Sequence, residues 1–214
     1  MEPAAKSLTE FALGCMLEPE ERAATLSCTD EGHLLVRVAG ETMTRTDGLL
    51  VCTENLVVRP LARRMQGRVV PEVFARLAAL EGDGYLVLAH QGERFHVVDL
   101  EGDLCFFVEP YLWAMDAGLL WDVGVVPGTR RDRPIPLVRA AGEGMLAFRV
   151  PGRLVAIKVA DDRPIRIARD RLVGWVGAVV PRADPEGPFL RCEGEGAVLV
   201  WFPRAPADGS SAPS

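Results

Sequence analysis

A short motif constrains the fold of this chain more than any other feature: a Gly-acid-Gly triplet followed directly by an apolar run. It occurs at Gly82–Gly84, Gly142–Gly144 and Gly194–Gly196. Glycine-rich turns bind phosphate where a helix N-terminus follows and supplies free amides, whereas a strand-like run follows each triplet here. We therefore interpret each triplet as a tight turn with positive φ that opens a β-strand.

The first two triplets belong to a longer internal repeat. A shift of 60 residues relates a unit at about 82–126 to one at about 142–181, and the apolar pattern keeps its register without gaps. A match of this length indicates two structurally equivalent β units. The aligned pairs include Gly92 with Gly152, Phe95 with Val155, Cys105 with Ile165, Phe107 with Ile167 and Leu112 with Leu172.

Short apolar runs bounded by Gly, Pro and Asp occur at intervals of about ten residues, which is typical of a sandwich or barrel. The sequence therefore predicts an all-β fold, a β-sandwich of two internally repeated units with few or no helices. The expected strands are His33–Val38, Leu49–Cys52, Tyr85–Ala89, Arg94–Leu100, Leu104–Val108, Met145–Val150, Leu154–Val159, Pro164–Ala168, Leu172–Val176 and Ala197–Phe202.

We expect one β domain over residues 8–202, with a loose N-terminus at 1–7 and a disordered tail at 203–214, because the tail is rich in Pro, Ala, Gly and Ser. The segment Pro71–Leu80 is ambiguous. Its apolar residues fit a helix that starts at the proline, but they also alternate as in a strand.

The net charge of -6 argues against general affinity for nucleic acid or anionic lipid. Five widely spaced cysteines without a CxxC pair favour small buried side chains in a reducing compartment, not disulfides or zinc. No apolar run approaches the length of about 20 residues that spans a bilayer, and the N-terminus lacks the pattern of a signal peptide. We therefore expect a cytoplasmic protein without direct membrane insertion.

The sequence offers two candidate sites for chemistry or binding. His90 and His96, with Glu93 between them, are the only cluster with metal-ligand residue types, and they predict a hairpin on which a cupin-like metal site is one alternative. Arg130, Arg131 and Arg133 form a basic run in the loop between the repeats, and RNA binding through this loop is the other alternative. The simpler interpretation is that the histidines lie on the surface or in a hairpin, and that the arginines lie in a solvated loop.

No other pattern indicates catalysis. The chain has no G-x-S-x-G elbow, no phosphate loop and no dinucleotide fingerprint. Its carboxylates lie beside expected strands, where solvated strand ends are more common than a glycosidase pair. We therefore assign no catalytic, cofactor-binding or metal-binding residue, expect no cofactor, and expect a protein that is not an enzyme.

Residues Phe95–Val123 carry a resemblance to a known family. The run VVDLEGD at Val97–Asp103 and the run LWAMDAGLLWDV at Leu112–Val123 resemble the altered-inheritance-of-mitochondria family, member twenty-four type, which includes many small bacterial proteins. The likeness extends over roughly Gly82–Trp175 and is weak before Ala62. It implies a β-sandwich of the tryptophan-RNA-binding-attenuator-like kind, a tendency to form homotrimers, and a strand at Pro71–Leu80. The family has no assigned activity, so no functional residue is implied.

The resemblance and the missing catalytic set together predict a non-enzymatic, homo-oligomeric scaffold or interaction protein, with a trimer favoured. Sheet edges left open by a sandwich are commonly covered by oligomerisation. The expected partners are further copies of the chain and other proteins, and no nucleic acid is expected.

Overall fold

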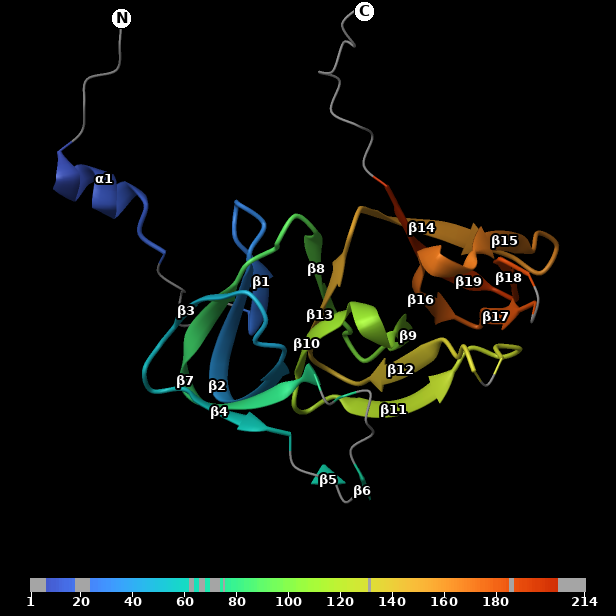
Figure 1. The fold of residues 1–214 in the computed structure, drawn as a ribbon, viewed down its shortest axis with the longest axis horizontal. Helices are drawn as coiled ribbons and strands as arrows, with labels where there is room; N and C mark the ends of the chain where they lie inside the picture. Colours follow the sequence, from blue (N-terminus) through green and yellow to red (C-terminus); the bar gives the residue numbers. More distant parts are fainter. Residues whose placement is uncertain are drawn as a thin grey trace, which may run out of the picture.

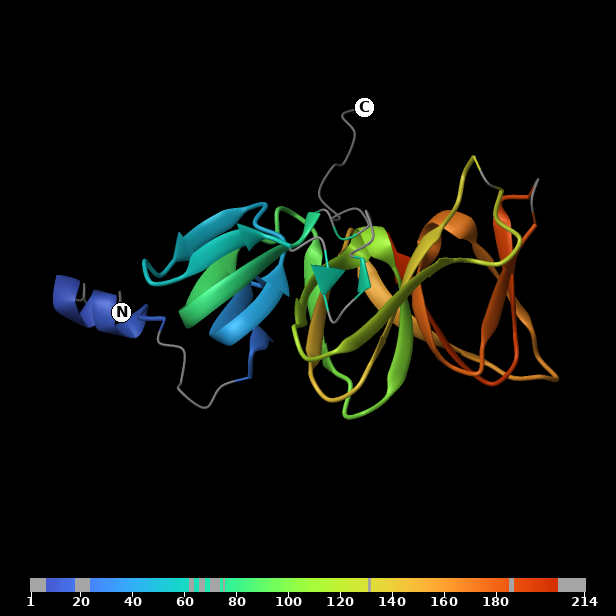
Figure 2. The ribbon, with the colours of Figure 1, turned by 90° about the horizontal axis from the view of Figure 1, so that it is seen from below.

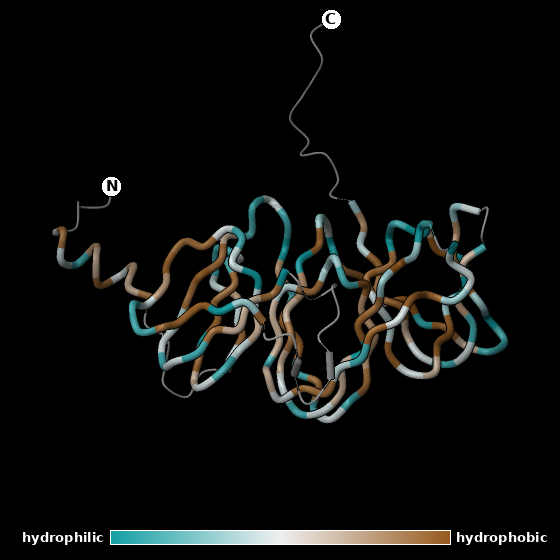
Figure 3. The backbone as a smooth tube through the Cα atoms, turned by 60° about the horizontal axis from the view of Figure 1, so that its bottom comes forward, coloured by the Kyte–Doolittle hydropathy of each residue, from teal (hydrophilic) through white to brown (hydrophobic). Residues whose placement is uncertain are grey.

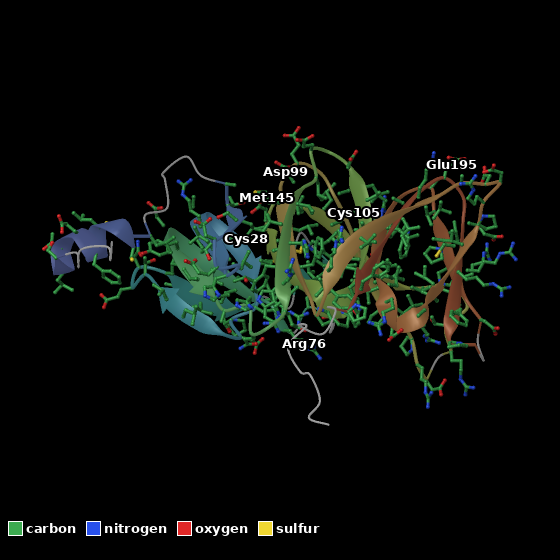
Figure 4. The ribbon with its side chains drawn as sticks, turned by 90° about the horizontal axis from the view of Figure 1, so that it is seen from above. Cys28, Arg76, Asp99, Cys105, Met145 and Glu195 are labelled. Carbon is green, nitrogen blue, oxygen red and sulfur yellow. The ribbon has the colours of Figure 1, made fainter. Side chains whose placement is uncertain are left out.

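The computed structural model describes residues 7–17, 24–61, 64–65, 68–69, 74, 76–130, 132–184 and 187–203. The fold is all-β and antiparallel throughout the described pairings. The described strands form three units that follow one another along the chain and lie in a row (Figures 1 and 2). Cys28, Cys105 and Glu195 mark the first, middle and third units in that order (Figure 4).

The first unit spans residues 26–88, and two long strands dominate it. β2 and β7 pair over their whole length, from Leu34 with Leu88 to Thr44 with Ala78. A separate hairpin of β5 and β6 lies between β4 and β7 in the chain. The strands of this part of the chain are β1 (Leu26–Cys28), β2 (Leu34–Thr44), β3 (Leu49–Cys52), β4 (Val57–Pro60), β5 (Arg64–Met65), β6 (Arg68–Val69) and β7 (Ala78–Leu88).

The middle unit spans residues 94–150, and the third spans 153–202. Each contains six strands and one short 3-10 turn that follows its second strand. The middle unit consists of β8 (Arg94–Asp99), β9 (Leu104–Val108), η2 (Glu109–Tyr111), β10 (Leu112–Asp116), β11 (Leu120–Val125), β12 (Pro136–Ala141) and β13 (Met145–Val150). The third consists of β14 (Arg153–Val159), β15 (Ile165–Ala168), η3 (Arg169–Arg171), β16 (Leu172–Gly177), β17 (Val180–Ala183), β18 (Phe189–Glu193) and β19 (Gly196–Phe202).

Neighbouring units share their sheets. An eight-stranded sheet joins the first unit to the middle one, because β2 pairs with β10. A six-stranded sheet joins the middle unit to the third, because β9 pairs with β16. The third unit ends in a three-stranded sheet of β15, β18 and β17, which we call the end sheet. The units are therefore fused through backbone hydrogen bonds.

Three apolar cores alternate with these sheets. The first core packs Leu34 and Leu86 against Ala114 on one face of the eight-stranded sheet. The middle core packs Met115 on the other face of that sheet against Phe107 of the six-stranded sheet. The third core lies between the six-stranded sheet and the end sheet, where Trp175 and Leu190 meet. Hydrophobic stretches accordingly follow the strands, while hydrophilic ones gather at the connecting loops (Figure 3).

The second and third Gly-acid-Gly triplets lie where the chain passes from one sheet to another, whereas the first lies within a single strand. β12 and β13 flank the second triplet, β18 and β19 flank the third, and the two strands of each pair have different partners. In the first unit β7 continues through the triplet and changes partner from β4 to β3. Gly82, Gly142 and Gly194 have φ of 135°, 112° and 98°, which favours glycine. The first triplet is thus a bend within one strand and not a turn that opens one.

The repeat occurs three times among the described strands. Pairing partners make β3, β10 and β16 equivalent, and each carries an irregularity in register two residues after its first pair. The 60-residue shift of the sequence relates β9 to β15 and β10 to β16, and the pairing extends the same scheme to the first unit. The sequence had predicted two units because the first unit retains only its triplet as a recognisable sign.

The ambiguous segment Pro71–Leu80 contains both 3-10 and strand conformation. Phe74 and Arg76 adopt 3-10 conformation, and the strand β7 begins only at Ala78. Phe74 is buried against Trp121, with ring centroids 4.8 Å apart, so this segment closes the middle core. Residues 71–73 and 75 lie outside the described residues, as do 1–6 of the expected loose N-terminus and 204–214 of the expected tail.

A short helix, α1 (Leu8–Gly14), precedes the sheets and buries none of its residues. Ser7 and Glu10 form a capping box at its start. The expected domain over residues 8–202 therefore contains an exposed helix before its first strand at Leu26.

Candidate interaction surfaces

The expected histidine hairpin does not form, because β7 and β8 on either side of the turn pair with different strands, but the turn still brings its three predicted residues to one shallow pocket. His90, Glu93 and His96 line a cavity of about 320 Å³ together with Asp30 and Glu31. His90 stacks on His33, with ring centroids 5.1 Å apart, and its Nδ1 accepts a hydrogen bond from the backbone N–H of Gly92 at 3.0 Å. One ring nitrogen of His90 is therefore already engaged in closing the turn.

The other two predicted residues, Glu93 and His96, have partners of their own. A carboxylate oxygen of Glu93 lies 2.5 Å from Nε of Arg149. His96 stacks on Phe148, with ring centroids 5.6 Å apart. Burial lowers the pKa of His96, and the nearby charge of Arg94 lowers it further. Within the described ranges, no group of three or more His, Cys, Asp or Glu side chains is placed to hold a metal ion.

The five cysteines carry free thiols. Cys105 and Cys192 are buried, and desolvation raises the pKa of Cys105 to about 12 and that of Cys192 to about 11. A thiol with such a pKa is a poor nucleophile at neutral pH, because the thiolate is the reactive form. These two side chains serve packing.

The basic loop that contains Arg130 and Arg133, between the first and second triplets, lies against the third unit. Nε of Arg130 is 2.9 Å from a carboxylate oxygen of Asp132. The guanidinium group of Arg169, at the start of η3, donates a hydrogen bond to the carbonyl oxygen of Arg133. Arg131 lies outside the described residues. The predicted basic run is thus joined to a further arginine that is distant in sequence.

The end sheet carries a row of arginines across all three of its strands. Arg166 of β15 lies directly opposite Arg191 of β18, which in turn lies opposite Arg182 of β17. All three are exposed. Like charges directly opposite each other destabilise a sheet. The ion pair of Arg191 with Glu193, at 2.6 Å, offsets part of this repulsion. Such a row costs stability unless a negative partner covers it.

Two adjoining cavities connect this row to the basic loop. One, of about 340 Å³, is lined by Arg166, Arg182 and Arg191, and the other, of about 620 Å³, is lined by Arg133 and Arg169. Gly187 and Pro188 line both cavities. We call the surface formed by Arg133, Arg166, Arg169, Arg182 and Arg191 the arginine surface.

Sequence reasoning found only the loop part of this surface. The alternation of apolar and basic residues over Pro164–Arg169 indicated a half-exposed strand but no partner for Arg166. Arg182 and Arg191 lie beside Arg166 only because of the register of three strands. The sequence alone does not give this register, so it could not predict that the three arginines are neighbours.

A second arginine cluster lies where the first unit meets the middle one. The guanidinium carbon of Arg149 is 3.6 Å from the ring centroid of Trp113, and that of Arg45 is 4.9 Å from it. Arg45 is buried, and its guanidinium group donates to the carbonyl oxygens of Glu109 and Pro110. Arg76 lines the same cleft near the boundary of the two units (Figure 4).

Carboxylates balance the charge of this second cluster. Glu109 lies 3.6 Å from Arg45, and Glu93 lies beside Arg149. Burial raises the pKa of Glu109, while the charges of Arg45 and Arg76 oppose that rise. We interpret the cluster as a polar joint that holds two units together.

None of the helices in the described part of the chain has the length and apolar character needed to cross a membrane.

Comparisons with known proteins identify a fold but no family. No family model matches the chain, and no curated protein matches it. The structure is similar to the crystal structure of protein SPYM3_0169 from Streptococcus pyogenes, with a TM-score of 0.65 and 13% sequence identity over 83% of this chain and 92% of that one. At this identity the likeness concerns the fold alone. The resemblance to the altered-inheritance-of-mitochondria family stays a prediction.

Proposed function

We propose that the protein is a non-enzymatic interaction protein of the cytoplasm that binds an acidic protein segment on the arginine surface. The observation that carries this proposal is the row of Arg166, Arg191 and Arg182 across the end sheet. Planar guanidinium groups bind carboxylates through paired, charge-assisted hydrogen bonds. An acidic segment laid across the three strands would therefore relieve the repulsion within the row.

The surroundings of the row favour a protein partner over nucleic acid. Asp184 lines the same cavity, and Glu193 already pairs with Arg191. Phosphate backbones need a more uniformly cationic face, and the net charge of -6 opposes their approach at long range. The exposed Phe189 supplies one apolar contact in the cavity, which suits a segment of mixed composition.

The test measures binding of fluorescein-labelled poly-L-glutamate by fluorescence anisotropy in about 0.15 M salt, where screening suppresses weak long-range attraction. The double variant Arg182→Gln/Arg191→Gln should weaken binding at least about tenfold, because charge-assisted hydrogen bonds to two arginines are lost. The matched control is Arg139→Gln/Arg153→Gln, which removes two exposed arginines from β12 and β14.

If both double variants lose the same amount of poly-L-glutamate affinity, net charge alone explains the loss, and the arginine surface is rejected as the binding site. If single-stranded RNA binds more tightly than poly-L-glutamate, and this binding needs Arg182 and Arg191, the partner is nucleic acid and not an acidic protein segment. No binding of either probe would overturn the proposal.

A further inference from the structure

Among the described strands, the row of units ends on each side in a strand with one free edge. In the end sheet β15 pairs with β18 alone, so its other edge is free among the described strands. In the first unit β3 pairs with β7 alone, and its other edge is free in the same sense. These two strands are the equivalents of the ones that join neighbouring units within the chain.

Both internal junctions are built in the same way. At the first, Thr44, Met43 and Thr42 of β2 pair with Ala114, Met115 and Asp116 of β10. At the second, Phe107, Phe106 and Cys105 of β9 pair with Gly174, Trp175 and Val176 of β16. β15 is the third-unit equivalent of β9, and β3 is the first-unit equivalent of β10 and β16. A third junction of this kind would join β15 of one copy to β3 of another.

From this continuity we infer that the chain associates head to tail, with β3 of one copy pairing antiparallel to β15 of a second copy. The repeat fixes the register of that pairing. Cys52 is equivalent to Met115 and Trp175, and Arg166 is equivalent to Met43 and Phe106, so Cys52 should lie opposite Arg166. This inference goes beyond the proposed function and does not depend on it.

Burial distinguishes β3 from its equivalents. Leu49, Leu50 and Val51 are 46%, 53% and 48% exposed. Their equivalents at the first junction, Leu112, Trp113 and Ala114, are 2%, 4% and 0% exposed. Those at the second junction, Leu172, Val173 and Gly174, are also buried. An exposed apolar strand at a sheet edge is a template for pairing with another chain, and here the positions are those that a neighbouring unit covers elsewhere.

The backbone groups at the two free edges are correctly oriented for this pairing. The N–H of Thr53 donates to the carbonyl oxygen of Tyr85 at 3.1 Å, so the N–H of the preceding Cys52 points away from β7. The N–H of Arg169 donates to the carbonyl oxygen of Pro188 at 2.9 Å, and alternation from there turns the N–H of Arg166 away from β18. Cys52 and Arg166 can therefore exchange hydrogen bonds.

Charge favours this contact over one between two identical edges. Asp47 and Glu54 lie just outside the two ends of β3, and both are exposed. In the inferred register Glu54 lies diagonally across from Arg166, where opposite charges stabilise a strand pair. Pairing β3 with a second β3 would bring acidic groups together, and pairing β15 with a second β15 would bring arginines together.

The contact leaves most of the arginine surface open. Arg191 and Arg182 are equivalent, by pairing register, to Arg139 and Asp122 at the second junction. Both of those residues remain exposed although β9 is paired with β16. A copy docked on β15 should likewise leave Arg191 and Arg182 accessible to a partner.

The first test follows molar mass against protein concentration by light scattering after size exclusion. The wild-type chain should form assemblies larger than a monomer, and Leu50→Arg should be a monomer because it introduces a charge into the covered position beside Arg166. The matched control is Leu120→Arg on β11, since Leu120 is 63% exposed on an edge strand that joins no unit. Leu120→Arg should assemble like the wild type.

The second test identifies the partner edge. Arg166→Pro removes an N–H that points to solvent, a position at which proline is tolerated in an edge strand. This variant should be a monomer on its own, and an equimolar mixture with Leu50→Arg should give a dimer, because one intact β3 meets one intact β15. Arg166→Glu, which opposes Glu54, serves as a second variant if the proline variant does not fold.

A wild-type monomer at every concentration, an undiminished assembly of Leu50→Arg, or a mixture that stays monomeric would each overturn the inference. The outcomes are separable from those of the proposed function. Leu50→Arg should still bind poly-L-glutamate, and Arg182→Gln/Arg191→Gln should still assemble.

Discussion

At the scale of single residues, Trp113 lies where the first and middle units meet. Trp113 contacts Arg149 on the middle unit and Arg45 at the end of β2, so that its ring joins two strands of different units. Cation–π contacts gain strength when they are shielded from water. Both arginines fulfil that condition, since their side chains are 5% and 12% exposed.

Arg149→Met should lower the free energy of unfolding by about 1–2 kcal/mol, because it keeps most of the aliphatic length and removes the cation over Trp113. Urea unfolding followed by tryptophan fluorescence measures the change. Arg139→Met is the control, since Arg139 is exposed on β12 and should give less than about 0.5 kcal/mol. Similar losses in both variants would contradict the role given to Arg149.

His96 should make the fold sensitive to mild acid. Its pKa is lowered in the fold, mainly by burial, so the unfolded chain binds a proton that the folded chain excludes. The stability that neutral His96 contributes is therefore fully present above the unfolded pKa of about 6.5 and is lost as the pH falls from there through the lowered pKa of the folded state. His96→Phe, which keeps a ring beside Phe148, should flatten the dependence of the melting temperature on pH between about 7.5 and about 5.5. Parallel profiles for the two proteins would refute this assignment.

At the scale of elements, the junction between β9 and β16 depends on a glycine. A Cβ on Gly174 would lie 2.3 Å from the carbonyl oxygen of Phe106 and 2.8 Å from a ring carbon of Phe107. The first of these contacts is with backbone and cannot be relieved by a change of rotamer. The two strands approach closely here because the position has no side chain.

Gly174→Ala should destabilise the protein by about 1–3 kcal/mol, the usual range for overpacking. Gly124→Ala is the matched control, because Gly124 lies in β11 and a Cβ there would meet nothing within 4 Å. Both changes reduce the freedom of the unfolded chain equally. The difference between their urea midpoints therefore isolates the clash, and equal midpoints would show that the junction can absorb the methyl group.

The elements that the sequence predicted well are short apolar runs that begin within two residues of a glycine. Leu49–Cys52, Leu104–Val108 and Met145–Val150 have the predicted bounds. β10 was missed because it is buried on both faces, so its apolar letters lack the alternation of a strand. α1 was missed although Ser7 and Glu10 form the S-x-x-E pattern that marks a helix start.

The arginine surface shows why the candidate site was harder to predict than the fold. Arg166 and Arg182 lie in different strands, and their meeting depends on Arg191 between them. Periodicity predicts which face of a strand a residue occupies, but the strand order and register decide its neighbours. The grouping of His90 and His96 in one pocket was predictable because they flank one short turn, whereas the predicted hairpin was wrong because β7 and β8 pair with different strands.

At the scale of the whole molecule, shared sheets should make the three units unfold together. Neither the first nor the third unit can separate without breaking backbone pairs to the middle one. In repeat proteins such strong coupling between neighbours suppresses partly unfolded states.

Native-state hydrogen exchange in increasing urea tests this coupling. The slowest amides of the β2–β7 ladder and of the β14–β19 ladder should converge on a single free energy of opening, equal to that of global unfolding. An earlier and separate opening of the β14–β19 ladder would show that the third unit is an independent domain.

The positive-φ glycines at the sheet crossings also bear on how such a chain can grow. At Gly142 and at Gly194 the backbone passes from one sheet into the neighbouring sheet, so the middle and third units each contribute strands to two sheets. Tandem duplication of about sixty residues, the length of the internal shift, would therefore lengthen the row by one complete unit. The free edges of β3 and β15 at the two ends would stay the same. Deletion of a unit at one end is different, because it exposes the edge of a sheet that two units share.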